Sequence, residues 1–390
     1  LSGRETLKRQ LAELRSKELW EFRHLFADLI NDKLLRNSDH VNHFRNRIFS
    51  VEVVFWAFLN QVFMVNAGCA SMVKKVQSWM IHRRRQVPSS NTSAYCQARG
   101  RLPLELLRTI LAGIVARMES RITPVEKWHG RTVKVVDGTG LSMPDTIANQ
   151  RSYPQSQSMA EGCGFPMINL TGVFSLNSGA LLGYAYGNKH IHENTLWRCL
   201  WHLLIPGDII LGDRGFCTFA NAAEMFRQGV DSVMRLHEWR GKKLIYGRQR
   251  KTTPDDRLAG WRKPKSGGKH WNDSEWRELP DALNVRVITV RVANSGFRTQ
   301  ELKLITTLMD QEKYSADAIA KLYFQRWKIE LFYRDIKTAM GMEVLKSQTP
   351  EQAHKELAMY AIAYNLVRAL IQEAAQKHTV APGRISFKGA

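Results

Sequence analysis

The chain has few cysteines, and they follow no pattern that would cross-link a small fold or hold zinc. Five cysteines occur among 390 residues, an odd number with no C-x-x-C pair. They are Cys69, Cys96, Cys163, Cys199 and Cys217. This scatter argues against a disulfide framework and against a zinc ribbon. It is typical of a reducing compartment, so we expect a cytoplasmic protein.

Long apolar runs are also missing. The most apolar stretch, Ser50–Val73, is interrupted by four polar residues: Glu52, Asn60, Gln61 and Asn66. A membrane-spanning helix needs about 20 consecutive, mostly apolar residues. A buried helix explains this stretch better, and no signal peptide is recognisable before it. We expect no membrane span.

Acidic residues are scarce relative to basic ones. The sequence holds 57 Lys and Arg against 36 Asp and Glu, a net charge of +21 with a pI near 9.9. Such an excess indicates a polyanionic partner, either nucleic acid or an anionic membrane surface. The basic residues are spread along the chain, which favours a folded basic surface over a disordered arm. The hydrophobic content of 44% is ordinary for a globular protein with two or three substructures.

Residues 1–122 read as helical and are predicted to form an N-terminal DNA-binding domain. Arg4–Leu35 has the pattern of a long amphipathic helix. Further on, a Pro/Ser turn at Pro88–Ser90 separates two helical stretches, the second carrying Arg99 and Arg101. This arrangement suits a helix-turn-helix that contacts DNA, and equally an ordinary helical bundle with a solvated basic face. The sequence leaves both open.

Residues 123–236 alternate between strand and helix patterns. Strands are expected at Arg131–Met143, Ile168–Leu176, Ala180–Tyr186, Asp208–Gly212 and Ser232–Leu236, and helices at Glu193–Leu204 and Ala220–Gln228. This order predicts an α/β fold with a ribonuclease H-like core, a mixed sheet with helices on its faces.

Two aspartates lie at strand ends in this core. Asp137 is on the first expected strand and Asp213 just past the fourth, which would be its neighbour. Ligands of α/β sheets gather where strand ends meet. Taken singly, each aspartate also suits a structural turn, because Asp-Gly and Asp-Arg-Gly are common turn sequences.

A third acid lies in the helical stretch Leu322–Gly341, LYFQRWKIELFYRDIKTAMG. Ser315 is placed as its N-cap and Gly341 as its C′ residue. At roughly 100° per residue, Tyr323, Arg326, Glu330 and Lys337 fall within about 40° of one another. Charged residues on one face are usually a solvated face, with Glu330 pairing Arg326 or Arg334. The alternative is an acid that holds a metal beside groups that hold phosphates.

These blocks together resemble the IS4 family of bacterial DDE transposases, the group that includes the Tn5 and Tn10 transposases. The string Tyr-x2-Arg-x3-Glu-x6-Lys is similar to the family's signature helix. The blocks around Asp137-Gly138-Thr139 and Gly212-Asp213-Arg214-Gly215-Phe216 are similar to its two aspartate blocks. The resemblance implies that Asp137, Asp213 and Glu330 form the catalytic, metal-binding triad. It also implies that Tyr323, Arg326 and Lys337 contact DNA phosphates.

Carboxylates brought together repel one another, so such a site needs a divalent cation. Oxygen-only ligation suits Mg²⁺, and we expect two Mg²⁺ ions at this site. We expect Mn²⁺ to be able to replace them. The resemblance implies binding of the inverted-repeat ends of an insertion sequence, cleavage through a hairpin, and strand transfer into target DNA. It implies a homodimer on double-stranded DNA, associated with the nucleoid and with no membrane partner. The alternatives are a host-adopted DNA-binding protein and a ribonuclease H-like nuclease without strand transfer.

Residues 237–308 are predicted to be a basic, β-rich insertion in the core. Its first part carries four tryptophans, Trp239, Trp261, Trp271 and Trp276, interleaved with basic residues. Such a surface suits phosphate binding and stacking of an unpaired base. In the family, an insertion here covers the DNA end and receives a flipped base. The sequence does not distinguish which tryptophan does so.

Residues 309–390 are expected to complete the core with C-terminal helices, including one at Glu351–Gln376. The resemblance is sharpest in the three acid-bearing blocks. A final motif, Lys189-His190-Ile191-His192-Glu193, precedes a helix and would bring His192 or Glu193 near the metals. A zinc site there lacks a second cluster of ligands. We leave this motif outside the predicted site.

Overall fold

The computed structural model describes residues 23–41, 48–64, 67–155, 160, 162–246, 253–267, 271–292 and 300–387. Its strands are β1 (Val133–Ser142), β2 (Met167–Ser175), β3 (Leu181–Gly187), β4 (Ile209–Gly212), β5 (Asp231–Arg235), β6 (Leu244–Tyr246), β7 (Asp256–Arg262), β8 (Ala282–Val292) and β9 (Gln300–Thr306). All nine belong to one sheet, in the order β3-β2-β1-β4-β5-β9-β8-β7-β6. The predicted mixed α/β architecture is confirmed.

The first five strands have the arrangement expected of a ribonuclease H-like core. Strands β1, β2 and β3 form an antiparallel meander, while β4 and β5 run parallel to β1. Valines at the start of β1 are buried, as in a strand covered on both faces.

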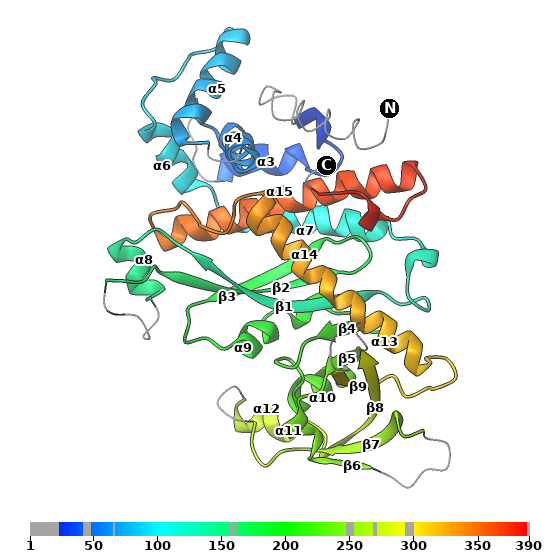
Figure 1. Cartoon of the computed structure of the whole chain (residues 1–390). Coiled ribbons are helices and arrows are strands. Elements are labelled where there is room, and N and C mark those ends of the chain that lie inside the picture. The colour runs from blue at the N-terminus through cyan, green and yellow to red at the C-terminus, as the bar shows by residue number, and fades with distance from the viewer. Residues whose placement is uncertain are drawn as a thin grey trace.

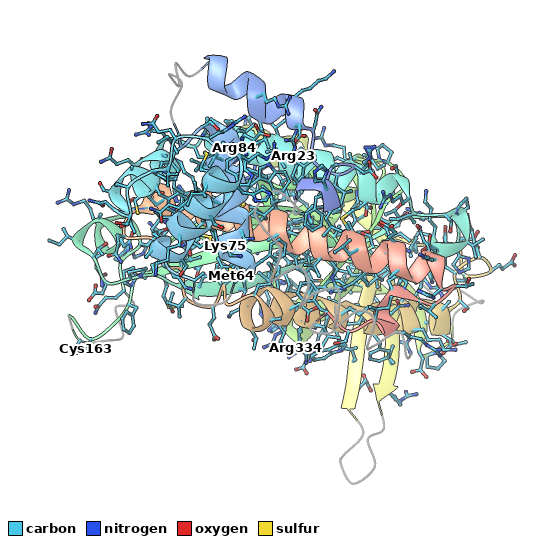
Figure 2. The ribbon with its side chains drawn as sticks, turned by 90° about the horizontal axis from the view of Figure 1, so that it is seen from above. Arg23, Met64, Lys75, Arg84, Cys163 and Arg334 are labelled. Atoms are coloured by element: carbon cyan, nitrogen blue, oxygen red, sulfur yellow. The ribbon has the colours of Figure 1, made fainter. Side chains whose placement is uncertain are left out.

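The strands expected in the predicted insertion extend this same sheet. Strand β9 pairs antiparallel with β5, and β8, β7 and β6 follow outward. Seen from above, β8 and β9 project beyond the helical layer (Figure 2). Residues 237–308 are therefore joined to the core by a continuous backbone hydrogen-bond ladder.

The helices are α3 (Asp32–Val41), α4 (Val51–Phe63), α5 (Cys69–His82), α6 (Ser93–Arg101), α7 (Leu104–Ser120), α8 (Ile147–Ser152), α9 (Glu193–Arg198), α10 (Phe219–Arg227), α11 (Glu238–Gly241), α12 (Asp273–Glu278), α13 (Ala316–Phe324), α14 (Lys328–Arg334) and α15 (Pro350–Lys377). Helix α15 and α7 lie on one side of β1–β3, and α9 lies on the other (Figure 1).

Helix α15 joins the N-terminal helices to the sheet. Thr349 caps it by accepting from the Gln352 N–H, and Pro350 occupies its first turn. It is buried on nearly all sides through its centre because it packs against α4 above and against α7 and β3 below (Figure 1). The described N-terminal residues are helical, and their independence as a domain stays a prediction.

Three predicted helices differ from those observed. A continuous helix through Leu35 is wrong, because residues 26–30 form turns before α3 begins; residues 1–22 of that prediction lie outside the described part. The helix expected at Glu193–Leu204 ends at Arg198, followed by a 3₁₀ turn. The helical run before Gly341 contains a 3₁₀ segment, Gln325–Trp327, and a π segment, Asp335–Ala339. Local pattern cannot specify these changes, which depend on tertiary packing.

The basic residue Arg99 is used inside the helical region. Its guanidinium lies 4.6 Å from the Phe58 ring centroid, and it donates to Gln61 Oε1 at 3.2 Å. Arg99 thus helps pack α6 against α4. This favours the helical-bundle interpretation for Arg99 over a DNA contact.

Arg286 is a fully buried residue of β8. It contacts β7 and the loop that connects β9 to α13. It forms a two-bond ion pair with Asp256, at 2.7 and 2.6 Å, and donates to the Tyr314 carbonyl at 2.6 Å. One residue before β8 ends there is a second two-bond pair, Arg291–Asp255, whose side chains are 58% and 42% exposed. The two pairs have the same chemistry and differ in burial.

We expect Arg286→Ala to lower the free energy of unfolding by about 3–5 kcal/mol, because it leaves the Asp256 charge half-buried and unpaired. Arg291→Ala is the matched control and should change stability little, since water screens that pair. Urea unfolding midpoints measure both. Equal effects of the two variants would contradict the importance of burial.

Candidate metal and DNA-processing site

The two predicted aspartates lie at the same height on adjacent strands. Strands β1 and β4 pair in parallel, with Val133 opposite Ile209 and Val135 opposite Leu211. Continued by two residues, this register sets Asp137 opposite Asp213. Asp213 follows the last residue of β4 and caps its own turn by accepting from the Gly215 N–H at 2.6 Å.

Burial makes the Asp137 carboxylate unfavourable in its charged form. The pKa of Asp137 is raised to about 6, chiefly by removal from water and further by the nearby charges of Asp213 and Glu193. The Gly138 N–H at 2.9 Å and the Arg326 guanidinium act in the opposite direction. Burial therefore outweighs these two favourable partners, and the neighbouring acids add to the rise of the Asp137 pKa.

Arg326 connects the third acid to the first. It is buried, and its guanidinium lies 3.4 Å from Asp137 Oδ2 and 4.0 Å from Glu330 Oε1. Its carbon Cζ is also 5.9 Å from the Tyr323 ring and 5.1 Å from the Trp327 ring. The structure thus brings Arg326 and Glu330 to Asp137, with the cationic group between the two carboxylates.

Glu330 is 53% exposed, and the ion pair it makes within the described residues is the long one to Arg326. Arg334, the other proposed partner, lies on the outer side of α14 (Figure 2). The described contacts include no ion pair between Arg334 and Glu330. An exposed Glu330 that pairs with Arg326 is also what a solvated face predicts, so the metal-binding role of Glu330 stays a prediction.

Tyr323 and Lys337 flank this group. Tyr323 is buried, and burial raises its pKa to about 12, so its hydroxyl keeps its proton and can donate to an oxygen. Lys337 Nζ donates to the Gly140 carbonyl at 3.2 Å and lies 3.4 Å from Thr139 Oγ1. Lys337 therefore borders the strand that carries Asp137, and Tyr323 lies beside Arg326.

One residue missed from the sequence fixes the backbone of Asp137. The Tyr333 hydroxyl donates to the Asp137 carbonyl at 2.7 Å. Gly172, opposite Asp137 on β2, makes room for it, since a Cβ there would lie 2.8 Å from that hydroxyl oxygen. No sequence signal separates Tyr333 from an ordinary core aromatic. Glu193, in the motif Lys189–Glu193 outside the predicted site, also lies near Asp137.

The residue types fit a hard divalent cation, because the three acids supply oxygen only and their mutual repulsion would be relieved by one. Within the described ranges, no three acidic, histidine or cysteine side chains already converge as a ready cage. The Arg326 guanidinium occupies the position between Asp137 and Glu330.

The raised pKa of Asp137 predicts the direction in which the free energy of unfolding changes with pH. With EDTA present, Asp137 of the folded protein keeps its proton up to about pH 6, whereas the unfolded chain loses it at about pH 4. The folded protein should therefore lose stability as the pH rises between these two values. Asp137→Asn should therefore be more stable than the parent at pH 7.5, by about 1–2 kcal/mol, with little difference at pH 4. Thermal unfolding against pH measures this, with exposed Asp281→Asn as the control. A pH-independent difference would contradict it.

Comparison with known proteins identifies the family of this chain. A family model described as "Transposase DDE domain" matches residues 128–366, well over half of the chain and a range that contains all three acids. The transposase InsG for insertion sequence element IS4 of Escherichia coli (strain K12) is 26% identical over 348 residues, covering 88% of this chain and 75% of that protein.

Two shorter matches are also to transposases of insertion sequence elements. A probable transposase for insertion sequence element IS5377 of Geobacillus stearothermophilus is 31% identical over 102 residues, 26% of this chain and 25% of that protein. A transposase for insertion sequence element IS421 of Escherichia coli is 30% identical over 69 residues, 18% of this chain and 19% of that protein. The chain is a DNA transposase and belongs to the DDE transposase family, in the IS4 group.

Proposed function

We propose that this transposase cuts and joins DNA with Asp137, Asp213 and Glu330 as its catalytic triad. The observation that carries the proposal is the parallel register of β1 and β4, which, continued by two residues, sets Asp137 opposite Asp213; Arg326 lies between Asp137 and Glu330. The three carboxylates would hold two Mg²⁺ ions, or Mn²⁺ in their place. When bound, these ions would supply an activated water and stabilise the leaving oxygen of the cleaved phosphodiester.

The chain's own residues would position the substrate. Tyr323 keeps its proton and would donate to a phosphate oxygen, and Lys337 and Arg326 would add positive charge at the same edge of the sheet. Tyr333 would hold the Asp137 backbone in place during the reaction. Catalysis of this kind rests on positioning and charge stabilisation, with no covalent link between enzyme and DNA.

The expected substrates are the inverted-repeat ends of an insertion sequence, followed by target DNA, with a homodimer bringing two ends together in the bacterial cytoplasm. The described residues contain no helix long and apolar enough to cross a membrane. By analogy with the family, the first cut would free a 3′-hydroxyl that attacks the other strand and leaves a hairpin.

Cleavage of a duplex carrying the flanking inverted repeat tests the triad. The intact protein should nick or form hairpins with Mg²⁺ and do neither in EDTA. Glu330→Gln should lose at least about 100-fold of this activity, because a metal-binding carboxylate is removed. Glu373→Gln on α15, also exposed, is the control.

Supplying a pre-cut end together with a target plasmid separates the related activities. A transposase joins the two, whereas a nuclease without strand transfer only degrades them. Tight binding of a verified end without cleavage by the intact protein would contradict an active enzyme and favour a DNA-binding role.

Trp239 is the strongest candidate among the four tryptophans for stacking an unpaired base. It is 60% exposed on α11, whereas Trp261 is buried and the Trp271 and Trp276 rings pack 5.9 Å apart. Lys243 Nζ lies 3.9 Å from the Trp239 ring centroid, which adds positive charge to an aromatic surface.

Helix α11 also adjoins the loop that carries Asp213. Arg240, next to Trp239, donates to the carbonyls of Arg214 at 2.9 Å and Cys217 at 2.5 Å. A base stacked on Trp239 would therefore come from DNA close to the triad.

Trp239→Ala should slow hairpin formation about tenfold while leaving first-strand nicking nearly unchanged, since stacking of one base contributes about 1–3 kcal/mol. Trp239→Phe keeps an aromatic face and should retain most of the activity. Gel analysis of nicked and hairpin products over time measures both steps. An equal loss in the two steps would indicate a structural role for Trp239.

A further inference from the structure

A fourth acid lies beside the triad. Glu193 occupies the first turn of α9, and its carboxyl carbon would lie 2.9 Å from a Cβ placed on Gly138, with Oε1 closer still. Gly138 directly follows Asp137, and successive residues of a strand point to opposite faces. A side chain at position 138 would therefore occupy the space that the Glu193 carboxyl uses. Glycine leaves that space open.

The start of α9 is also fixed to the loop of the second aspartate. Asn194 Nδ2 donates to the Gly215 carbonyl at 3.3 Å, and Asn194 Oδ1 accepts from Asn221 Nδ2 at 2.7 Å. His192 caps the helix by accepting from the Asn194 N–H at 3.1 Å. Glu193 thus lies between a neighbour of Asp137 and a neighbour of Asp213, on a helix start that hydrogen bonds hold in place.

The charge of Glu193 is unusual for this position. Among the described contacts it has no ion pair or side-chain hydrogen bond, although the chain carries a net charge of +21. Glu193 is exposed and lies near the two aspartates, since Glu193 and Asp213 both disfavour the charged form of Asp137. A carboxylate directed toward other carboxylates is unfavourable unless a cation joins them.

Resting on the proposed metal site, we infer that Glu193 contributes a fourth carboxylate to binding of the divalent cation. Helices α9 and α14 lie on opposite sides of β1–β3 (Figure 1), so Glu193 and Glu330 would approach the aspartates from different sides. A divalent ion accepts six or more oxygen ligands, and three carboxylates leave positions for a further one. The alternative is that the negative charge of Glu193 only stabilises the N-terminus of α9.

Metal affinity of the full-length protein distinguishes these roles. Mn²⁺ binding, followed by the electron paramagnetic resonance signal of the free ion, should weaken about tenfold in Glu193→Gln. Glu193→Asp keeps the charge and should fall between the parent and Glu193→Gln. Glu312→Gln, an exposed acid in the connection before α13, is the control and should bind as the parent does. Binding of the DNA end in EDTA should be intact in all three variants, which shows that they fold.

Asp213→Asn, measured in parallel, separates this inference from the proposed triad. If Asp213→Asn weakens Mn²⁺ binding and Glu193→Gln does not, Glu193 only stabilises the start of α9. The inference about Glu193 is then wrong, while the proposed triad stands. If neither substitution weakens binding, the metal site itself is wrongly placed. Weakening in both supports a four-carboxylate site.

Discussion

The parallel pairing of β1 and β4 is the constraint on which the site depends. Its register places Asp137 and Asp213 side by side, where two like charges repel and burial adds to the cost. Buried hydrophobic residues on both strands hold this arrangement against the repulsion, because moving either strand would expose the core. The free energy of packing thus maintains a cluster of acids that is unfavourable by itself.

The α13–α14 run completes the site by departing from an ideal helix. The 3₁₀ segment lies at Arg326, and the π segment lies at Lys337. Segments of this kind change which side chains face inward, and they are frequent at functional sites. Arg326 is buried against Asp137, while Glu330, four residues later, remains half exposed and able to turn. Rigid and adjustable groups therefore share one helical run.

The extension of the sheet beyond β5 brings DNA-facing groups and the triad into one framework. Buried Arg286 ties β7 and β8 to the connection that leads into α13. Arg240 ties α11 to the loop of Asp213. Two distant stretches of chain, 237–308 and 316–339, are thereby positioned relative to the same strand ends. Sequence showed both stretches but not these connections, since neither arginine stands in a recognisable pattern.

The sequence by itself determined the strand and helix order of the core, the three acid blocks and the family, because periodicity and short motifs are local properties. Tertiary structure alone decided which side chains meet. Tyr333 reaches the Asp137 carbonyl, and Glu193 reaches the space beside Gly138, because Gly172 and Gly138 lack side chains that would block them. Such contacts join residues far apart in the chain, and only the packed sheet sets the distance between them.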